Sequence, residues 1–300
     1  MNVKQSKDNS FPRLLTEGLW VVGNYYFNLY VLKGEQGSAL IEAGVSAVVD
    51  RVVDQLKELA VSPTFLVMTH PHADHATGLQ GLMERFPDAL VVAGEGAVEF
   101  LAHPKTGPLM VAEDEHMSQF LGAEGFDHRR PPVQEPPSLH HALIAKDQDE
   151  MDLGGITMRF LNVGGHSPGT IAVHVAELSA LMPADSLGFR FPGRGIVPLF
   201  FTSYPDYMDT LSRLAQFDAA ILGIPHQGPL TGDDVQAAFS EAYDTARALR
   251  DEIVADTREP EELARDLFER YYRDELTMYT PSNILNCMRL VIRRARESAQ

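Results

Sequence analysis

Four side chains able to bind a metal lie within six consecutive residues of this chain. The segment Thr69–Gly78 reads Thr-His-Pro-His-Ala-Asp-His-Ala-Thr-Gly and contains His70, His72, Asp74 and His75. Imidazole nitrogens and carboxylate oxygens together are the ligands of hydrolytic metal centres. The chain has only 11 histidines in 300 residues, so chance is a poor explanation for this spacing. The segment therefore predicts a metal site.

Three further candidates follow predicted strands later in the chain: His166, Asp185 and His226. Small residues beside each one allow the backbone to turn sharply and bring the side chain into a crowded site. A catalytic divalent metal takes about three protein ligands, and a pair of metals about 3.5–4 Å apart needs more, including a bridging group. Each of these residues is a weak signal alone, but they form an ordered set after the histidine-rich segment.

This ordered set resembles the metallo-β-lactamase fold superfamily over nearly all of residues 14–230. The resemblance implies a four-layer αββα sandwich, a mixed α/β fold with its site at one edge between two sheets. It also implies two divalent metal ions, and the presence of two aspartates indicates a binuclear hydrolase rather than a true β-lactamase. The implied ligands are His70, His72 and His166 for the first metal, Asp74, His75 and His226 for the second, and Asp185 as the bridge.

Two positions depart from the family pattern. The Ile-Asp-Ala-Gly of the family is replaced by Ile41-Glu42-Ala43-Gly44, and Glu42 is expected to lie near the site without being a ligand. The Pro-Gly-His-Gly of the family is replaced by Ile224-Pro225-His226-Gln227-Gly228, which keeps the histidine but predicts a loop of different shape.

The implied chemistry is hydrolysis by a hydroxide that bridges two metal ions. Two dications lower the pKa of a bound water from about 15.7 towards neutrality and polarise the substrate oxygen. Asp74 is the expected catalytic residue, because it can orient this hydroxide and accept a proton. We expect zinc, with iron and manganese as alternatives, since all three suit nitrogen and oxygen ligands.

These side chains need strands that end at a common edge. Short apolar runs bounded by turn residues predict strands, and apolar residues three or four apart predict helices. The alternation of the two favours a mixed sheet with its site at strand ends. The predicted strands are 19–22, 27–32, 38–41, 65–68, 89–92, 156–161, 171–175, 180–182 and 219–223, and the predicted helices before residue 230 include 47–59, 79–85 and 208–217.

Two segments have no regular pattern. Residues 103–141 are predicted to be a loop-rich insertion with one short helix near 113–121. Residues 187–206 combine aromatic side chains with Gly and Pro, which indicates a flexible apolar flap. Histidines expected to be surface or packing residues rather than ligands are His103, His116, His128, His140, His141 and His174.

The last third of the chain is predicted to be helical, which divides the protein into a core of residues 1–230 and a C-terminal region of residues 231–300 covering the site. Thr231–Asp234 has the form of a capping box, and Pro260 and Pro281 suit first helical turns. The layout resembles glyoxalase II and the aminobenzoylacetyl-coenzyme A thioesterase of the quinolone-signal pathway. Candidate pocket residues are Phe189, Phe191, Phe200, Phe201, Tyr204, Met278 and Met288.

Composition narrows the classes of partner. The formal charge of −17 opposes binding to nucleic acid and to anionic membranes. No signal peptide or membrane-spanning run is apparent, so a cytoplasmic protein is expected. The single cysteine, Cys287, excludes an intrachain disulfide and is expected to be a buried structural thiol. The apolar last helix is compatible with a homodimer or with an intramolecular contact.

The sequence leaves several functions open. The leading prediction is a hydrolase for a small-molecule thioester, ester or lactone with an apolar acyl group. A small-molecule phosphodiesterase and a regulatory metal-binding protein with little turnover are the alternatives. Specificity is expected to depend on the segment 187–206 and on the C-terminal helices.

Overall fold

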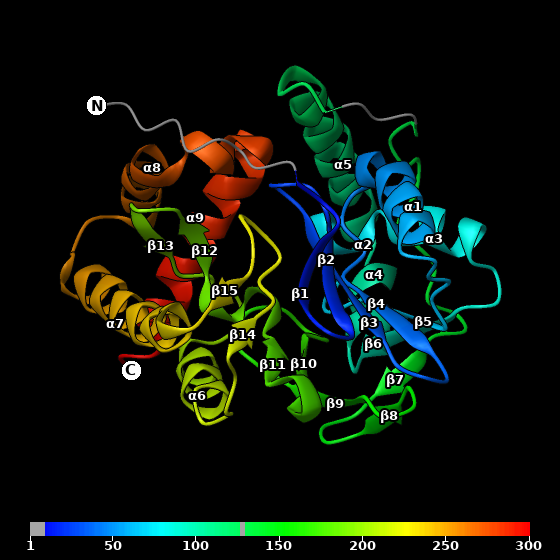
Figure 1. The fold of residues 1–300 in the computed structure, drawn as a ribbon. Helices are drawn as coiled ribbons and strands as arrows, with labels where there is room; N and C mark the ends of the chain where they lie inside the picture. Colours follow the sequence, from blue (N-terminus) through cyan, green and yellow to red (C-terminus); the bar gives the residue numbers. More distant parts are fainter. Residues whose placement is uncertain (1–9, 127–129) are drawn as a thin grey trace, which may run out of the picture.

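Two β-sheets pack face to face between two layers of helices in the computed structural model, which describes residues 10–126 and 130–300. In Figure 1 the blue and cyan helices cover the first sheet on the right, and the yellow to red helices lie beyond the second sheet on the left. This arrangement confirms the predicted four-layer αββα sandwich. His128 lies outside the described residues.

The first sheet has the strand order β1-β2-β3-β4-β5-β6-β7. Neighbours from β1 to β4 are antiparallel, and those from β4 to β7 are parallel. Its strands are β1 Arg13–Thr16, β2 Leu19–Gly23, β3 Asn28–Lys33, β4 Ser38–Ile41, β5 Phe65–Val67, β6 Leu90–Gly94 and β7 Leu143–Ala145.

The second sheet has the order β15-β14-β11-β10-β9-β8, and a separate hairpin pairs β12 with β13. Only β11 and β14 are parallel neighbours in the described part of this sheet. The strands are β8 Glu150–Asp152, β9 Thr157–Asn162, β10 Ile171–Val175, β11 Ala180–Met182, β12 Phe189–Phe191, β13 Gly195–Val197, β14 Ile221–Leu222 and β15 Leu230–Thr231.

Helices connect the strands and form the outer layers. None of those in the described residues is long and apolar enough to cross a membrane. The α-helices are α1 Val49–Glu58, α2 Ala73–Ala76, α3 Leu79–Arg85, α4 Ala97–Ala102, α5 Thr106–Ala123, α6 Tyr204–Leu214, α7 Asp233–Ala255, α8 Pro260–Tyr271 and α9 Pro281–Glu297. The 3₁₀ helices are η1 Ser46–Val48, η2 Ala176–Leu178, η3 Ala184–Leu187 and η4 Asp274–Met278.

The strands β2, β3 and β4 of the first sheet are buried on both faces, which explains their continuous apolar sequences. In β3, Tyr30 and Leu32 point into the core between the two sheets, where they join Phe160 of β9. Leu29 and Val31 belong to the second core, which lies under the helices. Successive side chains of a strand point to opposite faces, so β3 contributes to both cores. Packing on both faces holds the strand, and therefore the residues at its ends, in a defined position.

Three predicted elements differ in the structure. The segment 103–141 contains α5, an 18-residue helix rather than one short helix in a loop-rich insertion. The segment 187–206 contains the hairpin β12–β13, and Phe189 and Phe191 on it are buried rather than part of a flexible flap. The helix predicted over 208–217 is present, but it is shifted towards the N-terminus, because α6 spans Tyr204–Leu214.

The predicted helix starts had mixed outcomes. Pro260 and Pro281 lie in the first turns of α8 and α9, as expected. The capping box at Thr231–Asp234 is not formed, because Gly232 is the N-cap of α7 and no side chain caps it. Thr231 instead pairs with Ile221 in the second sheet.

Candidate metal centre

The histidine-rich segment begins where β5 ends, at the edge between the two sheets. Directly after β5, the N–H of Met68 still pairs with β6, because it donates to Val92 O at 2.9 Å. Ile171 N, at the start of β10, donates to Thr69 O at 2.8 Å and links the segment to the second sheet. His72 is the N-cap of α2, and the helix places Asp74 and the following histidine on the same side. Both sheets therefore hold the segment in place.

The later candidates lie on loops that follow strands of the second sheet. His166 follows β9, Asp185 lies in η3 after β11, and His226 follows β14. The loop before His166 requires glycine, because Gly165 has φ +90° and a Cβ there would lie 2.3 Å from Tyr207 N. These loops bring the side chains to the same edge as the histidine-rich segment.

Three non-glycine residues next to the candidates adopt left-handed backbone conformations. Glu42 has φ 75°, Ala184 has φ 52° and Gln227 has φ 60°. Such conformations cost about 1–3 kcal/mol each and persist where surrounding structure holds them, commonly at functional sites. The strained residues Ala184 and Gln227 are the chain neighbours of Asp185 and His226. The third, Glu42, is the glutamate that departs from the family pattern.

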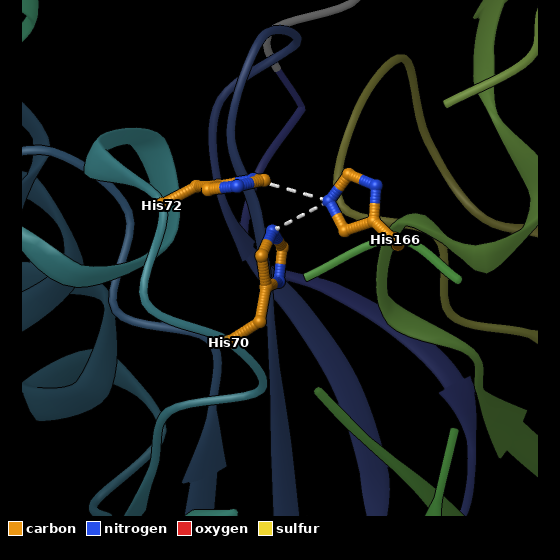
Figure 2. A group of neighbouring side chains, drawn as sticks. All are labelled: His70, His72 and His166. Atoms are coloured by element: carbon orange, nitrogen blue, oxygen red, sulfur yellow. Dashed lines mark hydrogen bonds between the residues drawn. The ribbon is translucent and has the colours of Figure 1, made fainter. Parts of the chain in front are cut away.

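Three histidines, His70, His72 and His166, converge in what we call the first cluster (Figure 2). The Nε2 atom of His166 lies 3.2 Å from His70 Nε2 and 3.1 Å from His72 Nδ1. His70 and His166 are fully buried, whereas His72 is partly exposed. Three ring nitrogens thus face one point from three directions.

A hydrogen bond on the far side of the His166 ring, and burial of all three rings, leave these nitrogens free of protons. His166 Nδ1 contacts Leu199 O at 2.9 Å, and a carbonyl can only accept, so the proton lies on Nδ1. Burial lowers the pKa of His70 well below its ordinary value and lowers the pKa of His72 to about 3. Burial also lowers the pKa of His166. The first cluster is therefore a set of neutral imidazoles with converging lone pairs.

Four residues, Asp74, His75, Asp185 and His226, form the second cluster, and all four are buried. Asp74 Oδ2 lies 3.0 Å from His75 Nε2 and 3.3 Å from His226 Nε2. His226 Nδ1 contacts Tyr26 O at 2.7 Å, which places its proton on Nδ1, the nitrogen that points away from the cluster. The Nε2 atoms of both histidines are buried and make no hydrogen bond.

Asp185 lies between the two clusters. Its Oδ2 is 3.9 Å from His70 Nε2 and 3.8 Å from His166 Nε2. The same oxygen is 3.5 Å from His75 Nε2, and Oδ1 is 4.0 Å from His226 Nε2. This carboxylate faces ring nitrogens of both clusters, the geometry that a bridging ligand requires.

The second cluster favours positive charge. Burial acts to lower the pKa of His75, but the carboxylates of Asp74, Asp185 and Glu42 outweigh burial and raise it well above its ordinary value. Burial acts to raise the pKa of both aspartates, but the adjacent histidines lower the pKa of Asp74 well below its usual range. They likewise lower the pKa of Asp185 to about 2. Both carboxylates are ionised at neutral pH.

Glu42 supports both clusters from outside them. Its Oε2 lies 2.8 Å from His75 Nδ1, and its Oε1 accepts a hydrogen bond from Thr69 Oγ1 at 2.7 Å. The Thr69 oxygen in turn lies 3.1 Å from His70 Nδ1. A carboxylate or hydroxyl that contacts the outer nitrogen of a histidine fixes the tautomer and the orientation of its ring. Glu42 thus lies beside the site and outside both clusters, where the sequence placed it.

One polar contact had no signal in the sequence. The hydroxyl of Tyr279, between η4 and α9, donates to Asp74 Oδ2 at 2.7 Å. Burial, and then the charges of Asp74 and Asp185, raise the pKa of Tyr279 well above its ordinary value, so its proton stays in place. The contact spans 205 residues of sequence, and a tyrosine near a helix start predicts no such partner.

The two clusters fit divalent metal ions. Within each cluster the potential ligand atoms lie within 4.8 Å of one another. Buried nitrogens without a hydrogen-bond partner are costly, and a cation would satisfy the Nε2 atoms of His75 and His226. The structure therefore brings all seven predicted site residues together, and their role as metal ligands stays a prediction. Among the other histidines, His116 contacts Thr277 O and His174 packs on Phe217.

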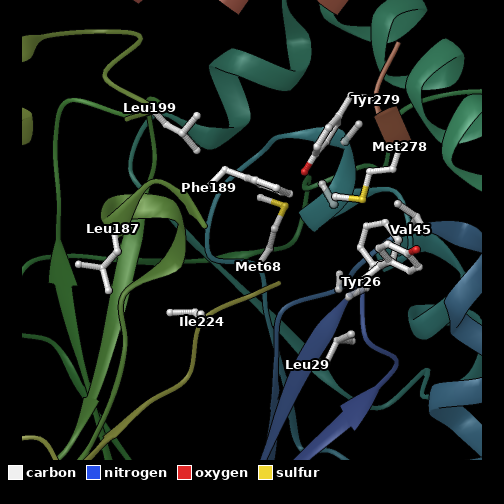
Figure 3. Packing of buried hydrophobic residues seen from close by; sticks show 14 of the residues in the cluster. Tyr26, Leu29, Val45, Met68, Leu187, Phe189, Leu199, Ile224, Met278 and Tyr279 are labelled. Carbon is white, nitrogen blue, oxygen red and sulfur yellow. The ribbon is translucent and has the colours of Figure 1, made fainter. Parts of the chain in front are cut away.

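A cavity of about 340 Å³ opens onto the clusters. His72, Asp74, His166 and Asp185 line its inner end. Its walls are largely apolar and come from α5, the β12–β13 hairpin and the segment 198–202, η4 and α9. Phe189, Leu199 and Tyr279, which Figure 3 shows among the buried hydrophobic side chains, line this cavity. Further wall residues include Phe201, Leu276, Ile284 and Met288.

The predicted pocket residues are divided by the structure. Phe189, Phe201 and Met288 line the cavity. Phe191, Phe200, Tyr204 and Met278 are absent from its described lining and pack in the second core instead. Cys287 also lines the cavity and is only partly buried, unlike the prediction, and burial raises the pKa of its thiol to about 12.

Comparison with known proteins identifies the family. A protein-family model described as the metallo-beta-lactamase superfamily matches residues 24–226. This chain belongs to that superfamily. The match includes all seven candidate ligands and ends at His226, so the C-terminal helices of this metallo-β-lactamase-fold protein lie outside it.

Curated relatives include hydroxyacylglutathione hydrolases. The protein from Ruegeria pomeroyi is 29% identical over 180 residues, which cover 58% of this chain and about half, 54%, of the relative. The protein from Parasynechococcus marenigrum is 24% identical over 262 residues, covering 87% of this chain and 85% of the relative. The acyl-coenzyme A thioesterase MBLAC2 of Gallus gallus is 23% identical over 211 residues, covering 66% and 71%.

Solved structures show the same fold. A metallo-β-lactamase family protein, TTHA1429 from Thermus thermophilus, has a TM-score of 0.61 and 22% identity, covering 90% of this chain and 93% of that chain. A β-lactamase domain protein from Burkholderia ambifaria has a TM-score of 0.66 and 16% identity, covering 96% and 89%. The family and the side-chain clusters together support a metal-dependent hydrolase of this superfamily, without defining its substrate.

Proposed function

We propose that this protein hydrolyses thioesters, or related esters and lactones, whose acyl group is apolar, with two divalent metal ions in the two clusters. The observation that carries the proposal is the cavity of about 340 Å³, whose apolar walls lead to His72, Asp74, His166 and Asp185. Ligand pockets of roughly 300–1,000 Å³ with apolar walls and a few converging polar groups are typical of small-molecule sites.

The relatives support the choice of bond. Hydroxyacylglutathione hydrolase and acyl-coenzyme A thioesterase are names of proteins that resemble this chain over 262 and 211 residues. Both names describe hydrolysis at an acyl group carried by a thiol compound. The apolar walls favour an acyl group without charge, because an unpaired charge in such a pocket would lose its hydration.

The residues of the chain have separable roles in this reaction. Two bound divalent ions would supply a lowered pKa for water and a polarised carbonyl. Asp74 is ionised and lines the cavity, so its Oδ2 can orient a water molecule and accept its proton. Phe189 and Phe201 line the cavity beside the clusters and would exclude bulk water from its inner end when an acyl group is bound. We propose zinc as the resident metal, with iron or manganese as the alternatives.

A substrate panel tests the proposal directly. Purified protein loaded with zinc, manganese or ferrous iron would be assayed with acyl thioesters of increasing chain length, with lactones and with phosphodiesters. Each additional buried methylene contributes about 0.8 kcal/mol, or roughly fourfold in kcat/KM, until the cavity is full. Turnover of phosphodiesters alone, or of no substrate with a full complement of metal, would contradict the proposal.

A cavity variant and a matched control sharpen the test. Cys287→Phe adds a ring to the α9 wall of the cavity, so we expect the preferred acyl chain to become shorter with little change for the shortest substrates. Leu285→Phe adds a ring on the same helix at a residue outside the described cavity lining. An equal chain-length preference in both variants would show that the acyl group binds elsewhere.

The partners of this protein and its location are further proposals. We propose a small-molecule acyl substrate, no nucleic-acid or membrane partner, and a cytoplasmic location, and homodimer formation is a prediction from the apolar last helix. Sedimentation of the purified protein would determine its oligomeric state.

A further inference from the structure

Tyr279 reaches the second cluster from a part of the chain that the family model does not match. The match ends at residue 226, and Tyr279 lies between η4 and α9 in the C-terminal helical region. Its hydroxyl is nonetheless 2.7 Å from a candidate metal ligand, Asp74 Oδ2. The side chain therefore belongs to the site by contact but to the covering helices by sequence.

We propose that Tyr279 is a positioning residue of the metal centre, whose hydroxyl fixes the Asp74 carboxylate towards the second cluster and thereby sets the affinity for the second metal ion. The inference rests on the two-metal site proposed above. It goes beyond that site by assigning to it a residue from the C-terminal region.

The hydroxyl acts on the oxygen that faces the cluster. Asp74 Oδ2 lies 3.0 Å from His75 Nε2 and 3.3 Å from His226 Nε2, and it is this oxygen that accepts the proton of Tyr279. Neither histidine Nε2 makes a hydrogen bond of good geometry, and both of these nitrogens would face the metal ion rather than the carboxylate once the site is loaded. The tyrosine supplies the directional bond that selects one rotamer.

The backbone around Tyr279 is held on both sides. Thr280 donates from its N–H to Glu113 Oε2 at 3.1 Å, and its hydroxyl donates to the other oxygen of the same carboxylate. On the other side, His116 Nε2 lies 3.1 Å from Thr277 O. Glu113 is buried and, like His116, lies on α5. Tyr279 is thus attached to α5 through both of its flanking segments.

The same helix holds the segment that carries Asp74. Asp114, the next residue of α5, is fully buried and accepts from Thr77 Oγ1 at 2.6 Å, directly after α2. It also accepts from Ser46 N at 2.9 Å. Donor and acceptor therefore share one rigid support, and ligands held in this way need little reorganisation to bind a metal.

The ring of Tyr279 has a second role that can be separated from the hydroxyl. It lines the cavity and packs edge-on against Phe189, with ring centroids 6.1 Å apart. Phenylalanine at position 279 keeps this packing and removes only the donor. A role limited to packing therefore predicts no effect of Tyr279→Phe on metal affinity.

The test is a zinc titration against a competing chelator, with no substrate present. For Tyr279→Phe we expect the second equivalent of Zn²⁺ to bind about 10–100-fold more weakly, the usual effect of losing a partner of a metal ligand. The first equivalent should bind as in the unaltered protein. Tyr25→Phe is the matched control, because it removes a tyrosine–carboxylate hydrogen bond to Glu275 outside both clusters.

Melting temperatures of the zinc-free proteins separate the local effect from a folding defect. A weaker second site in a variant that melts as the unaltered protein does supports the inference. Unchanged affinities for both equivalents overturn it, whatever the melting temperature, and so does binding of fewer than two equivalents by the unaltered protein. A variant that melts early would be titrated at a temperature below its transition, where the same two outcomes decide.

The outcome is independent of the proposed reaction. If the unaltered protein binds two equivalents of zinc but hydrolyses no thioester, ester or lactone, the proposed function fails and the titration still tests Tyr279. If hydrolysis is found, Tyr279→Phe should lower kcat at limiting zinc, with KM for the acyl substrate unchanged, and excess zinc should restore turnover.

Discussion

The two clusters are only a few ångströms apart, yet they are electrostatically opposite. The first contains three imidazoles, His70, His72 and His166, and burial lowers the pKa of each. The second contains two carboxylates and two imidazoles, and the carboxylates raise the pKa of His75. One cluster offers neutral lone pairs, and the other carries net negative charge.

This difference implies that the clusters differ in how they hold a cation. The first depends on geometry, because its nitrogens must converge without help from charge. The second attracts positive charge strongly but needs its ligands oriented, which Glu42 does for the His75 ring and Tyr279 does for the Asp74 carboxylate. Changes to shared residues should affect both metal ions, and changes to one set of supports should affect one.

The largest effect is expected from Asp185, because it faces both clusters. Asp185→Ala should remove the group that joins them, so the purified variant should retain little metal and show background turnover. Elemental analysis after gel filtration measures the metal content. Asp209→Ala, an exposed position on α6, is the control. Retention of two tightly bound equivalents by the Asp185 variant would show that the clusters are independent.

A smaller and unequal effect is expected from Glu42→Gln. An amide has one acceptor and one donor group, so it cannot accept from both Thr69 Oγ1 and His75 Nδ1, as Glu42 does. We expect the metal ion in the second cluster, which Glu42 contacts directly, to bind roughly 10–100-fold more weakly. The metal ion in the first cluster should be affected less. A chelator titration resolves the two equivalents. Equal weakening of both would place the influence of Glu42 mainly on Thr69 and His70.

Thr77→Val is expected to produce the smallest difference between the metal affinities of the two clusters. This change removes one donor from the buried carboxylate of Asp114, which should lower the free energy of unfolding by about 1.5–3 kcal/mol. Because Thr77 supports the segment that contributes to both clusters, the two metal affinities should change by the same factor. Urea unfolding and the zinc titration provide the two measurements. Selective loss of one equivalent would contradict this shared support.

Short-range patterns predicted a mixed sheet with candidate ligands at its strand ends, and the resemblance to the metallo-β-lactamase superfamily supplied the four-layer arrangement and the full ligand set. Four strands, β5, β9, β11 and β14, are each followed within a few residues by a candidate histidine or aspartate. Residues such as His166 and Asp185 could therefore be placed at the sheet edge without knowledge of any contact between them.

The features that the sequence did not predict depend on contacts between residues far apart in the chain, which local patterns do not contain. Helix α5 was predicted only in part, over 113–121, because it buries polar side chains, among them Glu113, Asp114 and Ser118, and these interrupt its apolar periodicity. The β12–β13 hairpin was interpreted as a flexible flap because its glycines and aromatic residues are typical of mobile loops. Its order comes from packing against the C-terminal helices. The hydrogen bond from Tyr279 to Asp74 joins residues far apart in sequence.

The position of Tyr279 has a consequence for how such proteins diversify. The helices that form a wall of the cavity also carry the donor to Asp74, although the family match ends before them. Recombination that exchanged only these helices would leave every candidate ligand in place. It would nevertheless alter acyl-group preference and metal affinity in one inherited step, so the two properties would evolve together rather than separately.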